Sequence, residues 1–278
     1  MGQVEFKKIA SKDTPIFYED CGVFNLNEEY VLTDSGLLID DKGKLIWNVE
    51  LEHCFSKAIY IKGREVIITD RIISFGMGGD FHLGIACIDI RTGNYRWKYF
   101  YDIGISRAKL KNKEPDINMV RNIGSVDIIK GYVYADGFEI NLVSGSYKYI
   151  GNEKVVRFEN KNIVPSKRVK SLKKKEGIGI KIDVINVDGL DFSKEGYFFN
   201  KCNFYISSNE YIYFFGIPAK KNPKNAVLFQ YSKTQKYIIE EIQLPTRNAP
   251  VEVYDFPHKG ALFILTDSIW LADGLFSN

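Results

Sequence analysis

The side chains best suited to chemistry are few in this sequence, and they lie far apart. The chain has three histidines, His53, His82 and His258, and four cysteines at positions 21, 54, 87 and 202. No two histidines have the spacing of metal ligands, and no Cys-x-x-Cys pair accompanies them. Scattered thiols in a chain of this kind are usually reduced and buried. We therefore expect no metal site, no disulfide framework and no cofactor.

The motifs of common enzymes are also missing. The Gly-rich stretch 76–82 joins two predicted strands, whereas a phosphate-binding loop needs a helix N-terminus after it. The Gly-x-Ser-x-Gly nucleophile motif is absent. Asp80, Asp102 and Glu139 could serve a small-carbohydrate hydrolase, which needs two facing carboxyl groups. We expect a non-enzymatic protein, and the hydrolase stays an alternative.

Positive charge is concentrated in three short stretches, although the net charge of the chain is only +3. The densest is the Lys167–Lys175 cluster, and the others lie at 106–113 and 220–224. All three fall in predicted loops, where charge keeps an aromatic-rich β protein soluble. The alternative is a nucleic-acid-binding surface in which the Lys167–Lys175 cluster acts with stacking aromatic rings.

The elements that carry these residues follow from a phrase that returns about every 50 residues, a period typical of repeat arrays. In each copy an apolar strand ends in Asp or Asn, a turn with glycine follows, and the next strand has an aromatic residue four positions after that glycine. The copies span 38–47, 87–97 and 140–149, and the aromatic residues are Trp47, Trp97 and Tyr149. Two strands around such a turn form a hairpin. We predict that Trp47 and Trp97 are structural residues that pack between neighbouring blades.

The phrase resembles the repeat of quinoprotein-type (PQQ-like) β-propellers, whose blades have a pattern close to Ala-x-Asp-x-x-Thr-Gly-x-x-x-Trp. The match is closest from Ala86 to Trp97. The resemblance implies a propeller scaffold. The quinone-dependent dehydrogenases of that family also have an adjacent Cys-Cys pair and calcium-binding carboxylates, and this sequence lacks the Cys-Cys pair. The resemblance therefore implies the scaffold without the cofactor.

We predict an all-β fold, a single β-propeller domain over 1–278 with five or six four-stranded blades. The repeat units are about 14–50, 57–100, 122–150, 203–244 and 250–278, with an irregular region at 153–200 that forms a sixth blade or an insertion. The last unit has three strands, so residues 1–10 are expected to supply its fourth strand and to close the ring.

The sequence also predicts a location and a binding role. The first residues have no apolar signal region, and no run approaches the roughly 20 apolar residues of a membrane span, so we expect a cytoplasmic protein. Rigid scaffolds commonly present binding residues on their loops. The best hypothesis is a bacterial immunity protein that binds and neutralises a cognate toxin domain, such as a nuclease, delivered by a neighbouring cell.

The partner surface is predicted on the loops between blades and on the loop between the second and third strands of the second blade. This face lies opposite the glycine turns and holds the insertions of variable length, including the basic stretch 166–176. The candidate partner-binding residues are Glu52, His53, Asp80, His82, Asp102, Arg107, Glu114 and Asp116.

Overall fold

The computed structural model describes a large part of the 278-residue chain. The described residues are 4–11, 22–34, 36–48, 55–70, 80–81, 83–100, 105–106, 115–151, 161–172, 174–175, 197–198, 204–207, 210–218, 225–235, 238–247, 250, 252–256, 258–265 and 267–275. Every described element is a β-strand except the short 3-10 helix η3 (Ile117–Met119). The all-β prediction is therefore confirmed. The chain divides into two compact units, residues 16–169 and residues 1–15 with 170–278.

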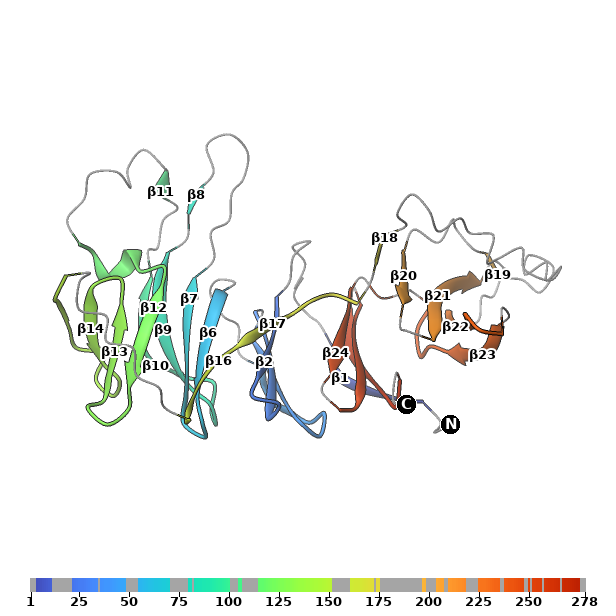
Figure 1. The fold of residues 1–278 in the computed structure, drawn as a ribbon, viewed down its shortest axis with the longest axis horizontal. Helices are drawn as coiled ribbons and strands as arrows, with labels where there is room; N and C mark the ends of the chain where they lie inside the picture. The colour runs from blue at the N-terminus through green and yellow to red at the C-terminus, as the bar shows by residue number, and fades with distance from the viewer. Residues whose placement is uncertain are drawn as a thin grey trace. The chain divides into compact units, whose positions relative to one another are not determined.

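The unit of residues 16–169 contains three large antiparallel sheets (Figure 1), besides the two-stranded sheet of β8 (Asp80–Phe81) and β11 (Ile105–Ser106). The first sheet comprises β2 (Val23–Leu26), β3 (Tyr30–Thr33), β4 (Leu37–Asp40) and β5 (Leu45–Asn48). The second comprises β6 (Phe55–Ile61), β7 (Glu65–Asp70), β9 (Gly84–Asp89) and β10 (Tyr95–Phe100). The third comprises β12 (Ile123–Asp127), β13 (Tyr132–Ala135), β14 (Phe138–Asn141) and β15 (Tyr147–Tyr149). Each predicted repeat unit in this part of the chain thus forms one up-and-down sheet of four strands.

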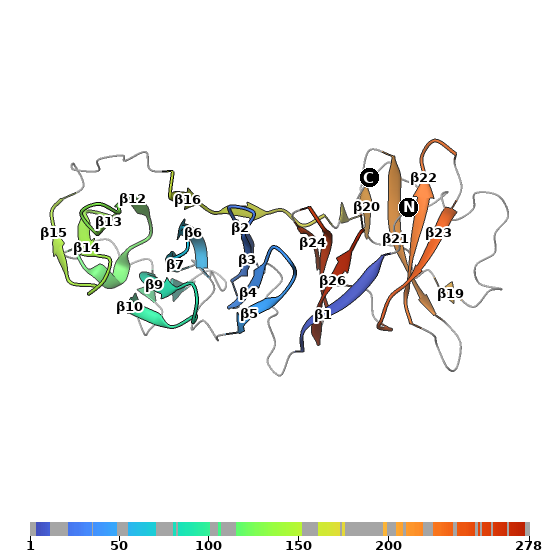
Figure 2. The same cartoon turned by 90° about the horizontal axis from the view of Figure 1, so that it is seen from below.

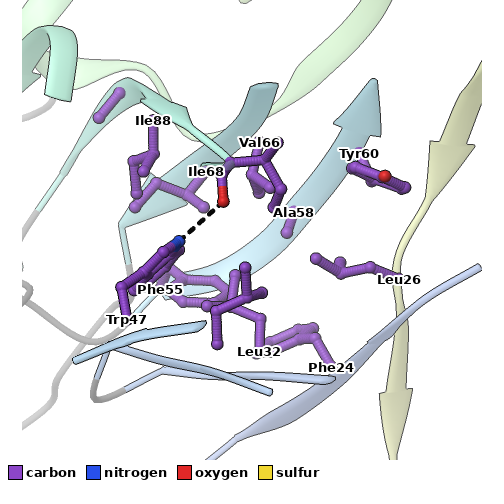
Figure 3. Close-up of a cluster of buried hydrophobic side chains, with 13 residues drawn as sticks. Phe24, Leu26, Leu32, Trp47, Phe55, Ala58, Tyr60, Val66, Ile68 and Ile88 are labelled. Atoms are coloured by element: carbon purple, nitrogen blue, oxygen red, sulfur yellow. Dashed lines mark hydrogen bonds between the residues drawn. The ribbon is translucent and has the colours of Figure 1, made fainter. Parts of the chain in front are cut away.

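Two apolar cores hold the three sheets together as successive layers (Figure 2). The first core lies between the first and second sheets and includes Phe24, Phe55 and Trp47 (Figure 3). The second lies between the second and third sheets and includes Trp97 and Phe138. Because successive side chains of a strand point to opposite faces, the second sheet contributes to both cores.

The turns of the repeated phrase have a common local structure. The Oδ1 atoms of Asp40, Asp89 and Asn141 each accept two backbone N–H groups of the turn. For Asp89 these come from Arg91 and Thr92, at 2.9 and 3.3 Å. The glycine of each turn has a φ of 77, 73 or 75°, a conformation that favours glycine. Each turn uses an Asp or Asn side chain as its cap and a glycine for its positive φ, and this shared requirement explains why the phrase recurs.

In the first two copies of the phrase, the aromatic residue links its sheet to the next one. The indole Nε1 of Trp47 donates to the carbonyl of Ile90 at 2.9 Å, drawn as the dashed line in Figure 3. The indole Nε1 of Trp97 donates to the carbonyl of Leu142 at 3.0 Å. In both cases the acceptor directly follows the capping residue of the next sheet's turn. The structural role predicted for the two tryptophans is therefore confirmed in these contacts.

Residues 161–169 do not form a sheet of their own. β16 (Ile163–Pro165) pairs with β6, and β17 (Lys167–Val169) pairs with β2, so each adds a fifth strand at a sheet edge (Figure 1). The prediction that the Lys167–Lys175 cluster lies in a loop is therefore wrong for Lys167 and Arg168. An edge strand can expose long charged side chains on both faces, and such charge discourages further strand pairing.

The second unit contains two more antiparallel sheets. The fourth sheet comprises β20 (Phe204–Ser207), β21 (Tyr211–Pro218), β22 (Val227–Ser232) and β23 (Ile238–Gln243), with β18 (Lys174–Lys175) on β20 and β19 (Tyr197–Phe198) on β21. Lys174 and Lys175 thus also lie in a strand. The fifth sheet comprises β24 (Glu252–Phe256), β25 (Gly260–Ile264), β26 (Ser268–Asp273) and β1 (Glu5–Ser11). β1 pairs with β26, so the N-terminal run supplies the fourth strand of the last unit, as its sequence predicts.

Candidate functional site

The sequence-predicted site residues fall mainly outside the described residues. Asp80 lies in β8 (Asp80–Phe81), which pairs with β11 (Ile105–Ser106), and its side chain is not described. Asp116 caps η3, and its Oδ1 accepts from the backbone N and the Nδ2 of Asn118 at 3.0 and 2.9 Å. Glu52, His53, His82, Asp102, Arg107 and Glu114 lie outside the described residues. Asp116 therefore makes a local contact that caps η3.

The third sheet has a second face whose composition differs from that of the core. Ser125, Tyr134, Glu139 and Lys148 are cross-strand neighbours in one row, and Asp127, Tyr132 and Asn141 form the next row. Cross-strand neighbours share a face, so all seven lie opposite the buried row of Val126, Val133 and Ile140. We call this surface of seven residues the tyrosine face.

The polar groups of the tyrosine face form a defined network. Lys148 Nζ lies 2.7 Å from Glu139 Oε1, and this contact lowers the pKa of the Glu139 carboxyl. Burial, followed by a hydrogen bond with Glu139, raises the pKa of Tyr134. A general acid of a glycosidase needs a raised carboxyl pKa, so the environment of Glu139 suits an ionised carboxylate and not that acid. The Ser125 hydroxyl is buried, and its Oγ has no hydrogen-bond partner among the described residues.

The tyrosine face contrasts with the corresponding surface of the second sheet. There the adjacent residues Ile67 and Ile68 point to opposite faces, and each is buried in one of the two cores. In the third sheet Tyr132 and Tyr134 are partly exposed, and Lys148 is exposed. A polar outer face is typical of the last repeat of an array.

Two aliphatic side chains border the tyrosine face at the turn end of the third sheet. Ile129, in the β12–β13 turn, is 93% exposed, and Val143, in the β14–β15 turn, is 64% exposed. The Leu142 N–H donates to the Gly131 carbonyl at 2.8 Å, which holds the two turns side by side. The position of Val143, two residues after the capping side chain, is occupied in the other sheets by Lys42 and Arg91. We did not predict this surface from the sequence, although the sequence has an apolar residue, Val143, at a turn position where the other sheets have a charged one.

The buried charges of the second sheet form a separate cluster. Glu65 is fully buried, and its carboxylate oxygens lie 3.4 Å from Arg64 Nε and 3.4 Å from Arg96 Nη2. Arg96 also contacts Asp89 at 3.0 Å. Burial, reinforced by the Glu65 charge, raises the pKa of the Cys87 thiol to about 12, and a protonated thiol is a poor nucleophile. This arrangement suits a structural role beneath the turn.

In the described part of the chain, no three His, Cys, Asp or Glu side chains gather in a way that could hold a metal ion. Nor does any helix among the described residues have the length and apolar character needed to cross a membrane. No protein-family model matches the chain, and no curated protein matches its sequence.

Proposed function

We propose that this chain is a non-enzymatic protein-binding module built from propeller-type blades, and that its partner binds the tyrosine face of the third sheet. The observation that carries the proposal is the composition of that face, with Tyr132 and Tyr134 beside the Glu139–Lys148 ion pair and Ile129 and Val143 at its border. The repeated phrase and the four-stranded sheets support the blades.

The chemistry of the surface is that of a protein interface. Tyrosine is enriched at interfaces because its ring offers a large apolar area and its hydroxyl a hydrogen bond. The opposite face of the third sheet is packed on the second sheet, so the tyrosines project from a rigid support. A preorganised surface loses little conformational entropy when it binds. Lys148 pairs with Glu139, and Lys130 Nζ lies 4.0 Å from Asp127 Oδ2, so both carboxylates of the face have a cation nearby. This favours a partner surface that is mainly polar and aromatic.

Within this class, we propose a cytosolic immunity protein that neutralises a toxin domain. The support is the absence of catalytic motifs from the sequence and the presence of a rigid surface with a specific chemical pattern. The test is co-expression of the chain with the product of the adjacent gene, and the readout is growth. Wild-type protein should restore growth and form a complex with that product.

Site variants then locate the contact. Tyr132→Ser with Tyr134→Ser should abolish protection while the chain stays folded at the assay temperature by circular dichroism, because neither side chain is part of the buried core. Charge reversal at Asp41 and Arg91, on exposed turns of the other sheets, should leave protection intact. Charge reversal at Asp80 and Glu114 tests the inter-blade loops instead. Loss of protection only from that set would refute the tyrosine face as the contact surface.

The surface must also be accessible in the free protein. Tetranitromethane nitrates exposed tyrosines, so peptide mapping should find Tyr132 and Tyr134 modified before Tyr60, which is fully buried. If both tyrosines resist nitration as strongly as Tyr60, the chain itself covers the face and the proposed contact is wrong.

A further inference from the structure

A short segment, which we call the strap (residues 161–169), lies along the edges of two sheets in the unit of residues 16–169. Ile163, Val164 and Pro165 are opposite Ile61, Tyr60 and Ile59 of β6. Lys167, Arg168 and Val169 are opposite Asn25, Phe24 and Val23 of β2. The strap therefore adds one antiparallel strand to each of two sheets in turn, as the strands beside β6 and β2 in Figure 1 show.

The backbone carries most of this contact. The Lys62 N–H donates to the Asn162 carbonyl at 3.0 Å, and Ser166 donates to the Ala58 carbonyl through both its N–H, at 2.9 Å, and its hydroxyl, at 2.8 Å. None of the nine side chains of the strap is buried. Ile163 packs only at the margin of the second core. Pro165 fits because proline is tolerated on an edge strand.

The sheets beneath the strap are complete without it. The third sheet has the same four-stranded order, and among its described neighbours no strand is added to β12. β2 and β6 each keep their pairing with β3 and β7 if the strap leaves. The strap thus has the properties of a bound extended peptide, in which main-chain hydrogen bonds give affinity and few side chains are enclosed.

We propose that the edges of β2 and β6 that pair with the strap are a strand-addition site that the chain fills with its own segment, and that an extended segment of a partner protein binds there when the strap is displaced. This inference rests on the proposed protein-binding function and adds a second contact to it. The site takes an extended segment with an aliphatic residue at the Ile163 position, a hydroxyl residue opposite Ala58, and cations at the next two positions, where Lys167 and Arg168 are exposed.

The competition between the strap and a partner segment can be quantified. A tethered segment has an effective concentration of about 1 mM. A free peptide with a dissociation constant of about 10 μM would therefore bind the wild-type chain about 100-fold more weakly than a chain whose strap is released.

The probe is a fluorescent peptide with the strap sequence Lys-Asn-Ile-Val-Pro-Ser-Lys-Arg-Val. Its binding to the full chain is measured by anisotropy for wild type, Ser166→Pro and Ser166→Ala. Ser166→Pro removes both donors to Ala58, because proline has no N–H, whereas Ser166→Ala removes only the hydroxyl. We expect binding to rise about 100-fold in Ser166→Pro and less in Ser166→Ala. A scrambled peptide should bind to none of them. Equal binding to wild type and Ser166→Pro would overturn the proposal.

Hydrogen exchange of the wild-type chain gives a second test that needs no variant. The amides of the strap should exchange at least 100-fold faster than those of β3 and β7, because the strap opens without unfolding the sheets. Strap amides as protected as those strands would overturn the proposal. The peptide-binding and hydrogen-exchange measurements are independent of toxin neutralisation. They can fail while the proposed function holds, and the proposed function can fail while they succeed.

Discussion

The two tryptophans that link neighbouring sheets provide the most direct test of the packing described here. Trp97 is 7% exposed, and its indole N–H is bound to the carbonyl of Leu142, a residue that is 1% exposed. Trp97→Phe keeps an aromatic ring but removes this donor and part of the ring volume. A buried acceptor left without its partner costs about 1–3 kcal/mol, and the lost ring volume costs about 1 kcal/mol more.

Trp270 supplies a matched control in the same chain. Its indole N–H donates to Ser268 Oγ at 2.9 Å, two residues away and within one strand, so it joins no two sheets. Trp270→Phe should therefore cost about 1 kcal/mol or less. Trp97→Phe should cost about 2–4 kcal/mol, and Trp47→Phe should behave like it, since its acceptor Ile90 is also buried.

The assay is urea unfolding followed by far-ultraviolet circular dichroism, which does not depend on tryptophan emission. With a slope of about 2–3 kcal/mol/M, the loss in Trp97→Phe lowers the midpoint by about 1 M. The chain has two compact units, so each transition is fitted separately. A midpoint shift in Trp270→Phe as large as that in Trp97→Phe would refute the role assigned to the inter-sheet bond.

Three further results are expected. Gly145→Ala should be more destabilising than Gly131→Ala by about 1–3 kcal/mol. Both glycines have a φ of +75°, but only a Cβ at Gly145 would contact Trp97, at 2.7 Å. Equal losses of stability in urea unfolding would contradict this contact. Deletion of residues 4–11 should uncover the edge of β26 and cause self-association detectable by sedimentation, and a monomer as stable as the full chain would contradict it. The backbone N–H groups of the turn lower the pKa of the Asp89 carboxyl, so the stabilisation from Asp89 is complete at neutral pH and is lost as the pH falls below about 4. Asp89→Asn should fold, since an asparagine occupies the same place in the third sheet. Between pH 6 and pH 3 this variant should lose less stability than wild type.

Local patterns allowed much of the fold to be predicted from the sequence. The glycine turns, the capping residues and the aromatic positions of the phrase depend on residues close in sequence, and the strands from 123 to 149 lie where the alternation places them. The pairing of β1 with β26 was also predictable, because the last unit lacked one strand. In the first unit, β2 (Val23–Leu26) was not predicted from the sequence.

The strap and the tyrosine face could not be predicted, for different physical reasons. The cations of 167–175 suggest a solvated loop, yet a strand at a sheet edge satisfies its backbone with one neighbour and leaves charged side chains in water. The tyrosine face depends on which of two alternating faces is packed, and this is decided by the neighbouring sheet. The residues Tyr132 and Tyr134 alternate with Val133 as in any half-buried strand, so the alternation alone does not show which face is packed.

The inter-sheet bonds of Trp47 and Trp97 also have a direction. The donor belongs to the earlier sheet, and the acceptor is the turn of the next sheet, so the second sheet both receives a bond through Ile90 and gives one through Trp97. The second sheet thus has a hydrogen-bond donor on one side and an acceptor on the other, so a copy of this sheet could bond to the original on either side. Duplication of residues 55–100 would therefore insert a sheet whose connections to both neighbours already match, which is a simple route by which an array of this kind can gain or lose members.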